Sequence, residues 1–297
     1  MRWKAILGAA IVVAFQVPAA AEDTGLAAVE GERSYAAEVA EAERIGREMF
    51  LYDQAAWQAT DRFLPRLGKL PQEQLRGYIV IPGEDGLLEA VFYGEVDGAL
   101  REFARYDVRE GKVVGGGILA AADRAELSPL AQRLVAARDA AIAEVIAKDY
   151  RFCSDQRPNT IVLPPDANDI VSAYLMTAPV SNASYPLGGH FRVDVGPDGK
   201  AGYSRRFLNS CFDAPFGSGE GNGKKKKKGK ADAPVEPEAL VVTHLLDPYP
   251  TEIHAFVSRY LPIGMIVVTT PNRGMWAVEG GRISFAGPLP EEERQED

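Results

Sequence analysis

The chain has few of the residues on which most enzyme sites are built. It contains two cysteines and three histidines in 297 residues. The serine-hydrolase motif Gly-x-Ser-x-Gly does not occur, and Gly115-Gly116-Gly117 does not lead into a helix as a phosphate-binding loop of the Walker type would. The His-Glu-x-x-His zinc motif is also absent. These absences exclude the enzyme classes that are recognised by such motifs.

Long apolar runs are scarce too, and the one that stands out lies at the N-terminus. Two basic residues precede an uncharged stretch from Ala5 to Phe15, and three alanines follow at 19–21. This pattern predicts a cleavable secretory signal peptide over residues 1–21. The run is shorter than the roughly 20 residues that cross a bilayer, and no cysteine near the cleavage site could carry a lipid. We therefore expect an exported protein, periplasmic or secreted, without a membrane span.

Positive charge is the minority sign. The chain has 33 Lys and Arg against 42 Asp and Glu, which gives a net charge of −9. Loss of residues 1–21 removes two basic residues and brings the net charge to about −11. Nucleic-acid binding needs clustered Lys and Arg against phosphates, so this balance makes nucleic acid an unlikely partner.

One segment departs from this balance. Residues 217–238 are rich in Gly, Lys and Pro, and Lys224–Lys230 contains six of the lysines. Such a composition cannot bury a core, so we expect a disordered surface insertion. The Lys224–Lys230 loop could contact anionic envelope polymers. The alternative is a solvated insertion that leans on the acidic tail at 291–297. No aromatic residue interrupts the lysines to stack on a base.

The first half, residues 22–150, has the pattern of an α+β unit. Apolar residues recur every three or four positions from Tyr35 to Phe63, which predicts a helix. A second helix is predicted to begin at Pro129, with Ser128 as its N-cap. Short apolar segments between these helices predict an antiparallel meander. Its strands are expected at 78–81, 87–93, 100–108 and 113–119.

The pattern of the second half, residues 151–290, predicts a mostly antiparallel β region that is interrupted by the insertion at 217–238. Strands are predicted at 170–176, 190–195, 202–207, 240–246, 253–260, 263–269 and 275–278. The whole chain is thus expected to be α+β, with an N-terminal helix, a meander and a second helix before the β region. The boundary near residue 150 is a change of pattern and not a linker.

The two cysteines, Cys153 and Cys211, predict a disulfide, because exported proteins mature in oxidising compartments. Closing a loop of about 58 residues would stabilise the fold by roughly 4 kcal/mol in the chain-entropy account. The alternative is a thiol enzyme in which Cys211 is the nucleophile and His190 the base.

The histidines offer a possible metal site. His190, His244 and His254 all fall on predicted strands. If residues 247–251 form the turn of a hairpin, His244 and His254 face each other and could share a zinc ion, with His190 or Glu252 as a further ligand. A turn shorter by one residue would point the two rings to opposite faces.

These observations favour a non-catalytic binding or structural module of the cell envelope. The alternative is an envelope enzyme that uses zinc at His190, His244 and His254, or the thiol of Cys211.

Overall fold

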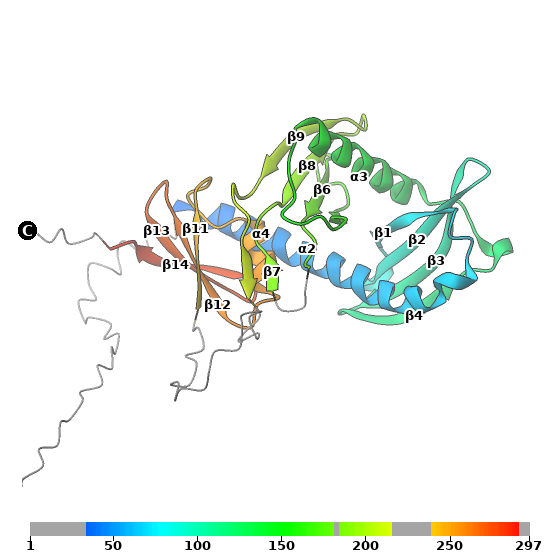
Figure 1. The fold of residues 1–297 in the computed structure, drawn as a ribbon, viewed down its shortest axis with the longest axis horizontal. Helices are drawn as coiled ribbons and strands as arrows, with labels where there is room; N and C mark the ends of the chain where they lie inside the picture. The colour runs from blue at the N-terminus through cyan, green and yellow to red at the C-terminus, as the bar shows by residue number, and fades with distance from the viewer. Residues whose placement is uncertain (1–33, 181–183, 216–238, 291–297) are drawn as a thin grey trace, which may run out of the picture.

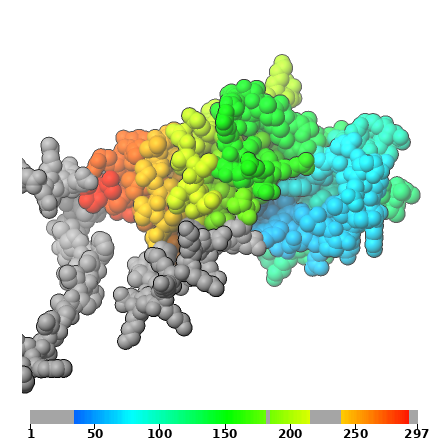
Figure 2. Space-filling view, viewed as in Figure 1, coloured from blue at the N-terminus to red at the C-terminus, as the bar shows by residue number. Residues whose placement is uncertain are grey.

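The computed structural model describes residues 34–180, 184–215 and 239–290, and the structural statements below concern these residues. The predicted signal peptide, the Lys-rich insertion and the acidic tail lie outside them. The molecule is elongated, and the first and last sheets of the chain form its two ends (Figures 1 and 2). No helix in the described ranges combines the length and the apolarity needed to cross a membrane.

The helix α2, Ala36–Phe63, runs along most of this length (Figure 1). Its buried residues recur at helical spacing and include Ile45, Met49 and Phe63. The chain then tightens into a 3₁₀ helix at Leu64–Lys69, which has proline near its start. The helix predicted from Tyr35 to Phe63 is confirmed.

The predicted meander and second helix are also present. Strands β1 (Leu75–Pro82), β2 (Leu88–Val96), β3 (Ala99–Arg109) and β4 (Lys112–Ile118) form one antiparallel sheet in sequence order. The helix α3, Pro129–Ala147, has Ser128 as its N-cap, and the hydroxyl of Ser128 accepts a hydrogen bond from the amide of Ala131 at 3.2 Å. Both predictions are confirmed.

The second half contributes three sheets. An antiparallel sheet has the order β5 (Asn159–Val162), β6 (Val171–Met176), β8 (Phe191–Val195) and β9 (Ala201–Arg206). The short strands β7 (Ser184–Pro186) and β10 (Asp213–Pro215) pair with each other. The last sheet has the order β11 (Ala239–His244), β12 (Gly264–Thr269), β13 (Gly274–Glu279) and β14 (Arg282–Pro288).

One predicted strand is wrong. Residues 252–258 form the helix α4, Glu252–Ser258, so the strand expected at 253–260 does not exist. Every residue of α4 is buried, and a helix that is buried on all sides lacks the one-faced pattern by which helices are recognised. Because α4 returns the chain to the start of the sheet, β11 and β12 pair in parallel, an exception in the mostly antiparallel region.

Both halves of the chain share their cores. Side chains from β2 alternate between two apolar clusters, with Phe92 facing α2 and Val91 facing α3. The cluster around α2 continues into the last sheet through Trp276, and the cluster around α3 continues into β8 through Val193. The first sheet is therefore covered on both faces, and α3 joins it to the β5–β9 sheet.

The predicted disulfide is present. Cys153 follows α3, Cys211 follows β9, and their Cα atoms lie 5.4 Å apart. Gly188 and Gly189 pass directly beside the bridge. A Cβ atom on Gly189, whose φ is +68°, would lie 2.7 Å from the amide nitrogen of Cys153. The two glycines before His190 thus provide room for the bridge.

The tightest contact between helices is the crossing of α2 and α4 at Gly46. A Cβ atom at this position would lie 2.7 Å from that of Ala255 and 2.8 Å from the carbonyl oxygen of Glu252. Only glycine therefore lets the two backbones approach this closely.

We expect Gly46→Ala to lower the free energy of unfolding by about 2 kcal/mol, because overpacking a rigid contact outweighs the better helix propensity of alanine. Chemical denaturation measures this loss. Gly68→Ala is the matched control, since nothing lies within 4 Å of its Cβ position. Equal effects of the two substitutions would contradict a constraint at the crossing.

Candidate ligand-binding cleft

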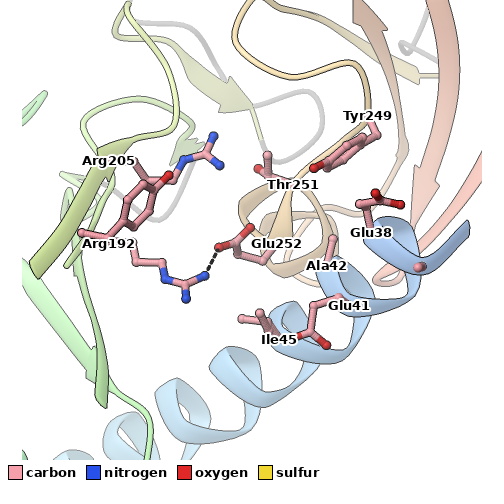
Figure 3. A pocket seen from close by; sticks show the side chains of 11 residues that line it. Glu38, Glu41, Ala42, Ile45, Arg192, Arg205, Tyr249, Thr251 and Glu252 are labelled. Carbon is pink, nitrogen blue, oxygen red and sulfur yellow. Dashed lines mark hydrogen bonds and ion pairs between the residues drawn. The ribbon is translucent and has the colours of Figure 1, made fainter. Parts of the chain in front are cut away.

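A cleft of about 420 Å³ opens between α2, the β8–β9 hairpin and the start of α4 (Figure 3). This volume lies in the range of roughly 300–1,000 Å³ that small-molecule sites occupy. The lining residues are Ala37, Glu38, Glu41, Ala42, Ile45, Arg192, Tyr203, Arg205, Tyr249, Thr251 and Glu252.

The wall formed by the β8–β9 hairpin carries two arginines. Arg192 and Arg205 are directly opposite each other in the antiparallel register, so both side chains leave the same face of the sheet. Like charges in this arrangement repel, and the fold places carboxylates behind each of them. The cleft therefore has a wall of two arginines, which are held by the half-buried Asp194 and Asp247 and the buried Glu252.

All three guanidinium nitrogens of Arg192 donate hydrogen bonds to carboxylates. Its Nε and Nη2 donate to Asp194 at 2.7 and 3.1 Å, and its Nη1 donates to Glu252 at 3.3 Å. Tyr174 donates its hydroxyl to the same oxygen of Glu252 at 3.2 Å. Burial opposes the charge of Arg192, but these carboxylates outweigh it and the pKa of the guanidinium is raised.

Arg205 is engaged through one nitrogen. Its Nη2 donates to Asp247 at 2.6 Å, and its guanidinium lies 4.6 Å from the ring centroid of Phe207. Burial opposes ionisation of Asp247, but hydrogen bonds from His244 and Arg205 outweigh it and lower the pKa of Asp247. The Nε and Nη1 atoms of Arg205 form no hydrogen bond to the described residues and remain available for a ligand on this wall.

The opposite wall is the first part of α2, and its charges are negative. Both carboxylate oxygens of Glu41 accept hydrogen bonds at 2.7 Å from Arg44, which holds the pKa of Glu41 below its usual value. Glu38 is exposed and forms no ion pair with the described residues. Among the described residues that line the cleft, Glu38 is thus the acid without an ion pair, and Arg205 is the arginine with fewer hydrogen bonds (Figure 3).

Apolar and aromatic groups complete the surface. Ala42 and Ile45 are buried on α2 and give the cleft an apolar floor. Tyr249 lies at the rim, where its ring packs on Tyr35 with centroids 5.3 Å apart. Such a surface suits a ligand with a short apolar body between two charged groups.

The structure brings two of the three predicted histidines together. The rings of His244 and His254 are buried and lie 4.8 Å apart between centroids, nearly perpendicular to each other. They meet because α4 packs beside the end of β11, and not across a hairpin. Nδ1 of His244 and Nε2 of His254 are buried without a hydrogen-bond partner among the described residues.

Each of these rings has a structural partner. Nδ1 of His254 accepts a hydrogen bond from the amide of Thr251 at 3.0 Å, which satisfies a free backbone group at the start of α4. Nε2 of His244 lies 2.8 Å from Asp247 and so supports the carboxylate behind Arg205. The pair therefore lies behind the arginine wall of the cleft.

His190 is held elsewhere. Its Nδ1 accepts a hydrogen bond from the amide of Thr177 at 3.1 Å, and its Nε2 lies 2.8 Å from the carbonyl oxygen of Pro186. Both ring nitrogens are thus used by the backbone. Within the described ranges no group of three or more His, Cys, Asp or Glu side chains is arranged to hold a metal ion, so the structure adds no support to the predicted zinc site.

The cysteines leave no thiol in this part of the chain. Cys211 is bonded to Cys153, and the described residues contain no free cysteine. A sulfur in a disulfide cannot act as the nucleophile of the alternative mechanism. The backbone amide of Cys153 instead donates to the hydroxyl of Thr177 at 3.1 Å, which links the bridge to the segment that holds His190.

Sequence reasoning did not find Arg192, Arg205 or Glu38. Their spacing along the chain carries no motif, and acidic residues are too frequent in this chain to single one out. The alternation of charged and apolar residues in 191–195 predicts a strand with one polar face. It does not predict that α2 lies opposite this face.

Comparison of the chain with protein families, with curated proteins and with solved structures finds no match.

The buried histidines should make stability depend on pH. Burial lowers the pKa of His190 to about 4, and burial together with the neighbouring His244 lowers the pKa of His254 to about 3. The folded state thus keeps both rings neutral, whereas the unfolded chain takes up protons near pH 6.5. Their contribution is fully present above that pH and is lost as the pH falls toward 4.

We expect His190 and His254 each to account for about 2 kcal/mol of lost stability between pH 7 and pH 5. Urea unfolding across this range measures the loss, and the slope should be shallower for His190→Gln than for the unmodified protein. Comparing slopes separates this effect from the general cost of the substitution. Parallel slopes would show that His190 does not titrate in this way.

Proposed function

We propose that the chain is an exported, non-catalytic binding protein of the cell envelope whose cleft takes a small zwitterionic ligand. The anionic group of the ligand lies against Arg205, and its cationic group lies against Glu38. Export is supported by the predicted signal peptide, and the disulfide between Cys153 and Cys211 suits an oxidising compartment.

The observation that carries this proposal is the opposition of charge across the cleft. Among the described residues, two nitrogens of Arg205 on the sheet wall have no hydrogen-bond partner, and the carboxylate of Glu38 on the helix wall has no ion-pair partner. A ligand with one charge would leave the other wall without a partner. A ligand with both charges pairs with each wall, and a guanidinium matches the two oxygens of a carboxylate.

On the sheet wall, the position of Arg205 is fixed before a ligand arrives. Asp247 holds Arg205, and His244 holds Asp247 at 2.8 Å. Rigid side chains lose less conformational entropy on binding, so a preorganised wall favours affinity. His244 thus serves as a positioning residue for the binding wall in this proposal, and His254 packs against it.

Isothermal titration calorimetry with the dipeptide alanyl-alanine tests the proposal. We expect binding that weakens at least tenfold when the amino group is acetylated, and again when the carboxyl group is amidated, because each change removes one ionic contact. The dipeptide should be recovered intact after incubation with the protein. Its hydrolysis would favour the enzyme alternative.

Two substitutions test which wall of the cleft binds the amino group of the dipeptide and which binds its carboxyl group. Glu38→Gln should abolish the preference for the free amino group, and Arg205→Lys, which keeps a positive charge beside Asp247, should weaken the preference for the free carboxyl group. Glu73→Gln is a matched control, since Glu73 is exposed and lies outside the cleft. Absence of dipeptide binding, or equal affinity for the free and blocked forms, would rule out this ligand class.

A further inference from the structure

A second hollow of about 310 Å³ lies at the other end of α2, against the edge strand β4. The C-terminal part of α2 runs alongside β4 (Figure 1). The hollow is lined by Arg62, Arg66, Tyr106 and residues 113–117. It shares no residue with the cleft of the proposed function, so a ligand in the hollow would bind independently of one in the cleft.

Two arginines stand over this hollow. Arg62 and Arg66 are one helical turn apart and exposed, and neither forms an ion pair with a carboxylate of the described residues. Nη1 of Arg66 donates to the carbonyl oxygen of Arg62 at 2.7 Å, a contact that satisfies the end of the helix. The remaining donors of both guanidinium groups are left for a partner, in a chain whose net charge is −9.

The hollow also includes a buried donor without a partner. Tyr106 is 3% exposed, and its hydroxyl forms no hydrogen bond to any described residue. An unpaired buried hydroxyl costs about 1–3 kcal/mol. The hydrogen bond from Arg66 to the carbonyl oxygen of Arg62 does not involve this hydroxyl. A ligand oxygen in the hollow could accept the hydrogen bond.

Glycines form the part of β4 that lines the hollow. Gly116 is directly opposite Tyr106 in the antiparallel register, and its φ is +87°. A Cβ atom there would overlap the carbonyl oxygen of Arg105, so no other residue fits without rearrangement. The Cβ position of Gly117 meets nothing within 4 Å. Because β4 is at the sheet edge, some of its backbone amides face away from β3, and glycine lets an anion approach them.

We infer that this hollow binds a phosphate group. Two guanidinium groups, a phenol hydroxyl and edge-strand amides offer more donors than the two oxygens of a carboxylate accept, and they match the several oxygens of a phosphate. The source is either free phosphate or the headgroup of an anionic lipid. Leu64 and Val114 lie beside the arginines and are 55% and 60% exposed, which would suit contact with a lipid surface.

Two binding measurements distinguish the sources. One titrates inorganic phosphate into the protein by calorimetry, and the other sediments the protein with vesicles of phosphatidylglycerol or of phosphatidylcholine. A free-phosphate site binds in the first measurement. If the hollow is a headgroup site, the protein sediments with phosphatidylglycerol vesicles and not with phosphatidylcholine vesicles. Either pattern supports a phosphate site, provided that it depends on the residues named here.

The variants test that dependence. Arg62→Gln with Arg66→Gln should weaken binding at least tenfold, and Tyr106→Phe, which removes only the hydroxyl, should weaken it about threefold or more. Arg151→Gln with Arg157→Gln removes the same charge from exposed positions outside the hollow and should bind like the unmodified protein. No binding in either measurement, or equal loss in both double variants, would overturn the inference.

Discussion

The close crossing of α2 and α4 at Gly46 is the contact on which the rest of the structure depends. It brings the start of α4 against the first half of α2, and this places Glu252 and Thr251 at the side of the cleft. The same helix continues under the first sheet, where Phe63 stacks on Phe92 with ring centroids 4.0 Å apart. One long helix thus positions both the cleft at one end and the hollow beside β4 at the other.

Buried polar groups around α4 connect this packing to the cleft. His254 satisfies the amide of Thr251 at the start of the helix, and Glu252 in the first turn receives Arg192 and Tyr174. His244 packs on His254 and reaches Asp247, which holds Arg205. Charges that would be costly to bury alone are each paired, so the arginine wall is a consequence of how α4 docks.

The cleft and the hollow beside β4 differ in how far their charged side chains are paired within the protein. In the cleft, Arg192 is neutralised by carboxylates from its own fold, and the proposed ligand contacts rest on the spare donors of Arg205 and on Glu38. Beside β4, the arginines keep most of their donors and a buried hydroxyl has no partner among the described residues. The first arrangement suits a ligand of balanced charge, and the second suits an anion.

The sequence by itself determined the elements whose signals are local. Periodicity predicted α2, the cap at Ser128 predicted the start of α3, turn residues predicted the meander, and the cysteine count together with the expectation of export predicted the disulfide. Tertiary structure decided the rest. Residues 252–258 form a helix that is buried on all sides, and Ala255 of this helix packs against Gly46 of α2, more than 200 positions earlier in the chain. The cleft and the hollow likewise combine side chains that no local pattern links, because only packing sets which faces meet.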